Sequence, residues 1–216
     1  MRRSLLTLEQ VGYVHAADGR FVLTPRVLEL GYANLSSVQL PKLAQPHLEA
    51  LAEEVQESTG VSVLDGDEIV AIGGVTTKRV MTISVRVGGR LPAHATAAGR
   101  VLLAALPPEE SEALLMTRRP KRYTEHTVTD PEALRAALEQ TREQGWAIVD
   151  QEFEEGFFAI AAPVRDASGD AVAAVSVLTQ PGRMAASSAC RTLLPALLAT
   201  VAAIERDLAL VGPARR

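Results

Sequence analysis

The sequence predicts an α+β fold in which helices flank an antiparallel sheet. Two observations lead to this class. Apolar residues recur at helical spacing in some segments and alternate with polar residues in others, and the two kinds of segment mix without strict β-α-β alternation. A length of 216 residues with 47% hydrophobic and 22% charged residues is typical of one large globular domain, or of one domain with a small additional unit.

The N-terminal residues predict a helix, a hairpin and a second helix. Residues 2–11 place an apolar stripe on one side of a helix that Gly12 ends, and this stripe consists of Leu5, Leu8 and Val11. Asp18-Gly19 between two short apolar runs indicates a hairpin turn. Thr24-Pro25 is a typical helix start, and we expect that helix to reach about residue 36. This order is typical of the last part of a winged helix and of the segment that leaves it.

The rest of the chain predicts interspersed strands and helices. A helix is expected from about Pro41 to Ser58, ended by Gly60. The expected strands cover residues 61–64, 68–72, 81–87, 146–150, 158–164 and 172–179. The further helices are expected over residues 97–106, 108–117, 131–144 and 184–210.

Composition excludes some classes of protein. No apolar run is long enough to span a bilayer, no signal peptide is evident, and Cys190 alone cannot form an internal disulfide, so a cytoplasmic location is expected. The net charge of −4 argues weakly against a protein that coats nucleic acid. Residues 1–26 hold four arginines against two acidic residues, which fits a DNA-contacting arm but is equally compatible with chance.

One helix start has the chemistry of an anion site. Thr96 is suited to cap a helix that begins at Ala97, and small side chains leave the first N–H groups open at the positive end of the helix dipole. In the last strand, alternation places Ala174, Ser176 and Leu178 on one face and the intervening valines on the other. Ser176 can therefore line a cavity, although a satisfied buried hydroxyl is the alternative interpretation.

Two stretches carry the most specific pattern in the chain. They read LPAHATAAGRVLLAA over residues 91–105 and GWAIVDQE over 145–152, and the second continues to AIAAP at 159–163. Together they resemble the effector-binding domain of the IclR family of bacterial transcription regulators. RRSLLTLE at residues 2–9 and LTPRVLELGY at 23–32 resemble in particular the Pca type, which regulates the breakdown of protocatechuate and 4-hydroxybenzoate.

This resemblance implies a domain organisation and a function. Residues 1–23 would be the remnant of a winged helix-turn-helix with recognition helix and wing, 24–40 a linker helix, and 41–212 a GAF-like effector-binding domain. The protein is expected to sense a small carboxylate, to control DNA binding and to form homodimers or homotetramers. It is expected to need no cofactor and no metal.

The resemblance also implies site residues. The effector-binding residues would be Thr96, Ala97, Ala98, Val149, Ala159, Ser176 and Leu178, together with His94. The DNA-binding residues would be Arg2, Arg3, Ser4, Thr7 and Arg20. A complete winged helix needs two helices before the recognition helix, on the order of 50 residues. Because the chain begins within that helix, we expect either a misassigned start or a fragment. Without the two supporting helices, the chain is expected to bind DNA weakly or not at all.

Three positions depart from relatives that take very small polar keto acids. Those relatives tend to have an acid, a cysteine and a serine where this chain has Val149, Ala159 and Leu178. An apolar lining suits an aromatic acid or a longer dicarboxylate, such as protocatechuate, 4-hydroxybenzoate or 3-oxoadipate, better than glyoxylate or pyruvate. The N–H groups of Ala97 and Ala98 would then bind the carboxylate, with His94 or Arg86 as possible helpers, although Arg86 also reads as a solvated strand residue.

Two further hypotheses belong to other classes. The first is an enzyme that acts on small acids through His94 and the acidic loop of Asp150, Glu152, Glu154 and Glu155. It lacks a paired nucleophile and base, a nucleotide-binding motif and metal-ligand spacing among the four histidines. The second is a dimerising ligand-binding protein that no longer binds DNA.

Overall fold

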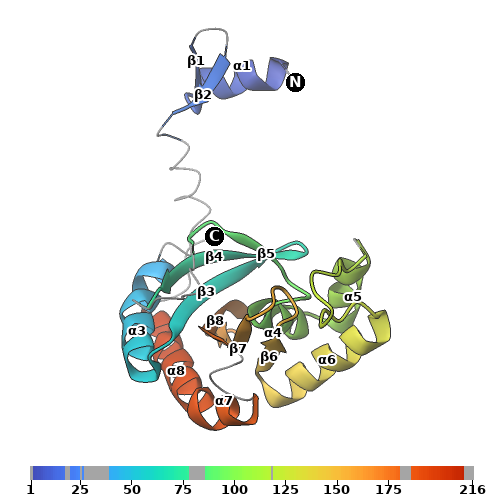
Figure 1. The fold of residues 1–216 in the computed structure, drawn as a ribbon. Helices are drawn as coiled ribbons and strands as arrows, with labels where there is room; N and C mark the ends of the chain where they lie inside the picture. Colours follow the sequence, from blue (N-terminus) through green and yellow to red (C-terminus); the bar gives the residue numbers. More distant parts are fainter. Residues whose placement is uncertain are drawn as a thin grey trace. The chain divides into compact units, whose positions relative to one another are not determined.

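The computed structural model describes residues 2–17, 20–24, 26, 39–77, 86–117, 119–180 and 186–211. It divides into two compact units, of which the first contains residues 1–40 and the second residues 41–213 (Figure 1). Each unit is described by itself. Within the described ranges, no helix combines the length and the apolar character that crossing a membrane requires.

The described part of residues 1–38 forms a helix followed by a hairpin. Helix α1 (Arg2–Gln10) ends at Gly12, whose φ of 80° lies in the left-handed region, and the N–H of Tyr13 donates to the carbonyl of Leu8 at 2.9 Å. Strands β1 (Val14–Ala17) and β2 (Arg20–Leu23) pair antiparallel, with Ala17 opposite Arg20. The helix and the hairpin predicted for this segment are confirmed. The helix predicted after Thr24 falls on residues 25 and 27–38, which lie outside the described residues.

An antiparallel sheet of six strands forms the centre of the second unit. Its order is β5-β4-β3-β8-β7-β6, and every neighbouring pair is antiparallel. The strands are β3 (Ser58–Asp65), β4 (Glu68–Val75), β5 (Arg90–Pro92), β6 (Ala147–Asp150), β7 (Phe158–Arg165) and β8 (Ala171–Thr179). The predicted α+β class with an antiparallel sheet is confirmed.

Helices cover both faces of this sheet. They are α3 (Gln39–Val55), α4 (Ala97–Ala105), α5 (Pro108–Thr117), α6 (Pro131–Gln144), α7 (Ala186–Thr192) and α8 (Leu194–Val211). Helix α4 packs on β6, β7 and β8 and against α6, whereas α8 packs on β7 from the other face (Figure 1). Successive side chains of β7 point to opposite faces of the sheet, and those of Ala159 and Ala161 pack in the core beneath α4.

Two predicted helix boundaries differ from the structure. Helix α3 ends at Val55, because Gln56 adopts a left-handed φ of 57° and its side-chain amide donates to the carbonyl of Glu53 at 2.7 Å. The single helix predicted over 184–210 is divided at Leu193, two residues before Pro195. Proline lacks an N–H and disfavours helical geometry in the residue before it, so it fits the first turn of a new helix but not the interior of an old one.

The strand predicted over residues 81–87 lies mostly outside the described residues, which resume at Arg86. Its last residue, Val87, belongs to a turn and is 67% exposed. The short strand β5 that follows was not predicted from the sequence. It pairs with β4 at Glu68, Ile69 and Val70 and leads directly into the turn before α4.

Candidate functional site

The start of α4 is fixed by its capping residue. Thr96 has extended backbone angles of φ −127° and ψ 146°, and its Oγ1 accepts a hydrogen bond from the N–H of Gly99 at 3.3 Å. The same hydroxyl donates to the carbonyl of Pro92 at 2.9 Å, which ties the helix start to the end of β5. The predicted cap at Thr96 is therefore confirmed.

Gly99 allows the preceding turn to lie directly on the helix. A Cβ added at Gly99 would lie 2.2 Å from the carbonyl oxygen of Ala93 and 2.3 Å from its Cα. These are backbone atoms of the turn, so no change of rotamer could make room. The absence of a side chain at Gly99 thus positions the turn formed by residues 93–96 against the first turn of α4.

Two backbone N–H groups at this helix start are open. Ala97 is 1% exposed and Ala98 is 4% exposed, so bulk water hardly reaches either residue. Within the described ranges, neither N–H has a hydrogen-bond partner. Buried donors without partners at the positive end of a helix dipole favour an anionic acceptor.

Three of the predicted ligand residues form one row across the sheet. Val149 in β6 is opposite Ala159 in β7, and Ala159 is opposite Leu178 in β8. All three are buried and belong to the same apolar cluster as Ala97 and Ala98. The structure therefore brings five of the predicted residues together between the start of α4 and one face of the sheet.

Ser176 lies in the next row along the strand. It is opposite Ala161 in β7 and Gly60 in β3. Its hydroxyl is buried and donates to the carbonyl of Gly60 at 3.5 Å, which is long for a hydrogen bond between two oxygen atoms. Ser176 is thus only weakly engaged and remains able to turn toward another acceptor or donor.

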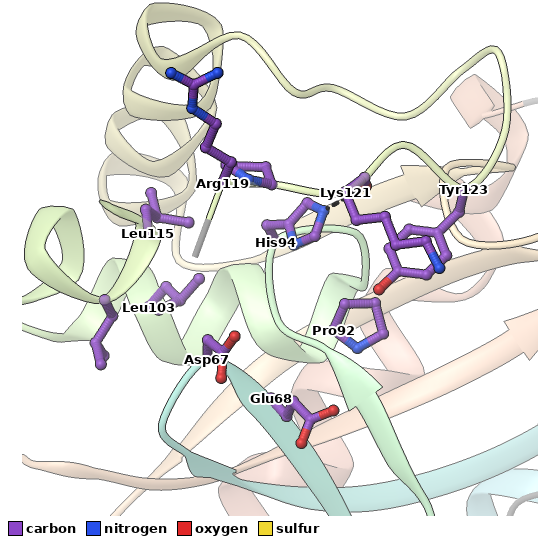
Figure 2. Close-up of a pocket in the computed structure, with 11 residues that line it drawn as sticks. Asp67, Glu68, Pro92, His94, Leu103, Leu115, Arg119, Lys121 and Tyr123 are labelled. Atoms are coloured by element: carbon purple, nitrogen blue, oxygen red, sulfur yellow. Dashed lines mark hydrogen bonds between the residues drawn. The ribbon is translucent and has the colours of Figure 1, made fainter. Parts of the chain in front are cut away.

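His94 lines a pocket of about 190 Å³ between the β3–β4 turn, α5 and the segment after α5 (Figure 2). The lining residues are Asp67, Glu68, Pro92, His94, Leu103, Leu114, Leu115, Arg119, Pro120, Lys121 and Tyr123. The Nε2 of His94 donates to the carbonyl of Lys121 at 3.1 Å, so the neutral ring carries its proton on Nε2. Burial lowers the pKa of His94 below its ordinary value, which keeps the ring uncharged at neutral pH. Val149, Ala159 and Leu178 are not among the residues that line this pocket.

A buried ion pair beside the start of α4 was not foreseen. The Nη2 of Arg100 in α4 lies 2.5 Å from Oε2 of Glu152, and only 7% and 9% of the two side chains are exposed. Arg100 also donates through Nε to the carbonyl of His94 at 3.0 Å. An arginine within the otherwise apolar sequence of α4 indicates that a buried ion pair is present, but the sequence does not show which carboxylate the arginine binds.

The loop between β6 and β7 is held by the segment that precedes α6. The hydroxyl of Thr124 donates to the carbonyl of Gln151 at 2.7 Å, and the hydroxyl of Thr127 donates to the carbonyl of Glu152 at 2.6 Å. The carboxylate of Glu152 also accepts the N–H of Val128 at 3.0 Å. This loop ends at Phe157, which packs in the same apolar cluster as Ala97 and Ala98.

The acidic residues of this loop have different surroundings. Glu152 is buried and paired, whereas Asp150, Glu154 and Glu155 are exposed. Among the described residues, no group of three or more His, Cys, Asp or Glu side chains is arranged to hold a metal ion. Arg86, the other cation considered for carboxylate binding, is exposed and lies outside any strand.

The predicted DNA-binding residues lie in the first unit. Arg2, Arg3, Ser4 and Thr7 belong to α1, and Arg20 begins β2. Ser4, Thr7 and Arg20 are exposed. The first unit thus offers polar side chains on a helix and on a hairpin.

Comparison with known proteins places this architecture in a family. The family model described as "Bacterial transcriptional regulator IclR C-terminal" matches residues 32–206. The Pca regulon regulatory protein of Pseudomonas putida is 43% identical over 210 residues, which cover 96% of this chain and 70% of that protein. The similarity to Pca-type regulators expected from the sequence is confirmed.

Solved structures agree with this result. A protein of Rhodococcus sp. RHA1 described as a transcriptional regulator is 49% identical and superimposes with a TM-score of 0.82, covering 98% of this chain and 84% of that one. An IclR homologue from Microbacterium hydrocarbonoxydans, crystallised with 4-hydroxybenzoate, is 31% identical with a TM-score of 0.79, over 96% of this chain and 84% of that one. The chain belongs to the IclR family of bacterial transcriptional regulators.

Proposed function

We propose that this regulator senses a small aromatic carboxylate, bound between the start of α4 and the row of Val149, Ala159 and Leu178. The carboxylate accepts hydrogen bonds from the N–H groups of Ala97 and Ala98. The ring of the ligand lies against the apolar row, and the hydroxyl of Ser176 forms a hydrogen bond with a polar substituent of the ring. We call this arrangement the effector site.

The open, buried N–H groups of Ala97 and Ala98 are the observation that carries the proposal. An unmade hydrogen bond to a buried donor costs about 1–3 kcal/mol, so two such donors favour a ligand that supplies acceptors. A carboxylate supplies two acceptor oxygens with negative charge, which the helix dipole also favours. Thr96 supports the site by fixing the helix start and does not itself need to contact the ligand.

The apolar row supports an aromatic acid over a keto acid. Val149 and Ala159 present only carbon atoms to the site, so a small polar acid such as glyoxylate would leave its remaining oxygen without a partner. The Microbacterium homologue bound to 4-hydroxybenzoate and the Pca regulon protein of P. putida are consistent with this class of ligand. Protocatechuate and 4-hydroxybenzoate are the aromatic candidates that we would test, and 3-oxoadipate, a longer dicarboxylate without a ring, is the alternative candidate.

Isothermal titration of the full chain with these three acids, and with glyoxylate and pyruvate, tests the ligand class. We expect heat with protocatechuate or 4-hydroxybenzoate and none with glyoxylate or pyruvate. Heat with 3-oxoadipate alone would contradict the aromatic assignment and favour the longer dicarboxylate. The variant Ala98→Leu should abolish binding, because the added side chain enters the site. Ala136→Leu on the exposed side of α6 is the matched control and should bind as the wild type does. If Ala98→Leu folds and binds normally, the location of the site is wrong.

We further propose that ligand binding controls DNA binding in this regulator. The exposed Ser4, Thr7 and Arg20, with Arg2 and Arg3 on the same helix as Ser4, would contact phosphates or base edges, and residues 24–40 would link them to the effector site. A homodimer or homotetramer would present two or more such units to an operator. An electrophoretic mobility shift assay on the DNA upstream of the protein's own gene, with and without ligand, tests whether the ligand controls DNA binding. Ligand binding without any ligand-dependent DNA binding would favour a sensor that no longer binds DNA.

A further inference from the structure

Arg100 places a buried positive charge beside the effector site. Its Nε donates to the carbonyl of His94, which precedes α4, so the side chain runs back along the helix toward its N-terminal end. Ala97 is three residues earlier and therefore lies on the same side of the helix. The guanidinium is only 7% exposed, so solvent screens its charge weakly.

Glu152 holds this guanidinium in place and offsets its charge. The two side chains are 2.5 Å apart, and the carboxylate also accepts the N–H of Val128. The guanidinium is therefore bonded to two separate segments, the turn before α4 and the β6–β7 loop. Because a second opposite charge lies so close, the field that Arg100 exerts on the effector site is weaker than that of a lone cation.

The two other side chains considered for carboxylate binding, His94 and Arg86, are not arranged in this way. His94 is neutral, since burial lowers its pKa, and its Nε2–H is committed to the carbonyl of Lys121. Arg86 is exposed, so water screens its charge. Arg100 is buried and fixed, and it does not need to contact the ligand to act on it.

We propose that Arg100 determines the charge specificity of the effector site, and that Glu152 sets how strongly it does so. The guanidinium stabilises the carboxylate of a bound ligand through space, while the N–H groups of Ala97 and Ala98 make the direct hydrogen bonds. This inference rests on the proposed function, because it places the ligand carboxylate at the start of α4. It assigns Arg100 and Glu152 as specificity-determining residues that act without touching the ligand.

The sign of each effect follows from the charges. Removing the negative charge of Glu152 strengthens the binding of an anion, and removing the positive charge of Arg100 weakens it. A neutral ligand of the same shape is hardly affected by either change. For charges on the order of 8 Å apart and an effective dielectric constant of 20 to 40, the change in carboxylate affinity is roughly five- to thirty-fold.

The test compares 4-hydroxybenzoate with its neutral analogue 4-hydroxybenzamide by isothermal titration of the full chain. The measured quantity is the ratio of the two Kd values, amide over acid, which cancels effects on shape and general folding. Glu152→Gln keeps the hydrogen-bonding shape and should raise this ratio roughly five- to thirty-fold. Adding Arg100→Gln to that variant should lower the ratio below the wild-type value.

Arg100→Lys is the matched control, since it retains the charge and should keep the ratio within about three-fold of wild type. Glu152→Gln leaves a buried guanidinium without its counter-charge and can fail to fold, which circular dichroism would show. In that case the double glutamine variant, which buries no charge, is compared with Arg100→Lys. Equal ratios in these two variants would overturn the proposal.

The two proposals fail in different ways. If the wild type binds neither 4-hydroxybenzoate nor the other aromatic-pathway acids, the proposed function is wrong. If it binds 4-hydroxybenzoate and all folded variants give the same ratio, the effector site stands and the role of Arg100 is refuted.

Discussion

A methyl group at Gly99 is expected to disturb the contact between α4 and the turn before it. In Gly99→Ala, the new Cβ would lie 2.2 Å from the carbonyl oxygen of Ala93, 2.3 Å from its Cα and 2.6 Å from its carbonyl carbon. All three are backbone atoms, so relief requires the whole turn to move away from the helix. Overpacking of a core typically costs about 1–3 kcal/mol, and a clash with backbone belongs at the upper end or above it.

An opposing effect must be subtracted. Alanine is favoured over glycine in a helix interior by about 1 kcal/mol, so Gly99→Ala gains this amount. With an overpacking cost of about 3–4 kcal/mol, we expect the variant to be less stable by about 2–3 kcal/mol. In a protein of this length each kcal/mol lowers Tm by about 2–4 °C, which gives a decrease of roughly 5–10 °C.

Thermal melting of the full chain, followed by circular dichroism, measures this decrease. Gly73→Ala in β4 is the control, because the nearest atom to its new Cβ is Cγ1 of Val61 at 3.1 Å, a side-chain atom. That variant should lose much less stability. If Gly99→Ala melts within about 2 °C of the wild type, the turn does not lie on the helix as described, and the geometry of the effector site must be reconsidered.

Two further predictions concern the helix caps at Thr96 and Asp130 and the pH dependence of stability at His94. Thr96→Val should lower the free energy of unfolding by about 1 kcal/mol and also weaken binding of the acid, because it removes the hydroxyl that accepts the N–H of Gly99. Asp130→Ala removes the cap of α6 and should lower the free energy of unfolding by a similar amount, but titration should show unchanged binding. His94 should make stability depend on pH, because burial holds its pKa in the folded state below the ordinary value of 6.5. The unfolded state therefore binds the proton more readily than the folded state. The stability that neutral His94 contributes is present above pH 6.5 and is lost as the pH falls below it. Urea denaturation at pH 7.5 and 5.5 should therefore show a smaller loss for His94→Asn than for the wild type, and equal losses would contradict this.

Local chemistry made much of the fold predictable. Helix α6 has Asp130 as its cap, whose side chain accepts the N–H of Ala133, proline in its first turn and Gly145 at a φ of 79° after its last residue. Each of these is a short-range signal, so the sequence alone predicts both ends of the helix. The row of Val149, Ala159 and Leu178 is a similar case, because alternation along each strand decides which side chains share a face.

Boundaries that depend on pairing between distant segments were harder to predict. Strand β5 has three residues, too few for a periodic pattern, and exists because β4 offers it an edge. At the division between α7 and α8, Pro195 indicates a break, whereas the regular apolar spacing on both sides of it indicates one continuous helix. Periodicity describes which residues face the core, but it does not show where a helix restarts.

The buried charge of Arg100 beside the start of α4 was the feature hardest to predict from the sequence. From the sequence, His94 and Arg86 were considered as helpers, with Arg86 also interpreted as a solvated residue. The structure instead buries Arg100 beside the start of α4 and pairs it with Glu152, 52 positions away. That pairing depends on the β6–β7 loop, whose position is set by hydrogen bonds from Thr124 and Thr127. No local pattern specifies such a contact. The same loop carries Glu152 and ends at Phe157, which packs in one apolar cluster with Ala97 and Ala98, so the ion pair joins the start of α4 to this loop. Under the proposed role of Arg100, charge specificity and the position of this loop would be coupled through the Arg100–Glu152 ion pair.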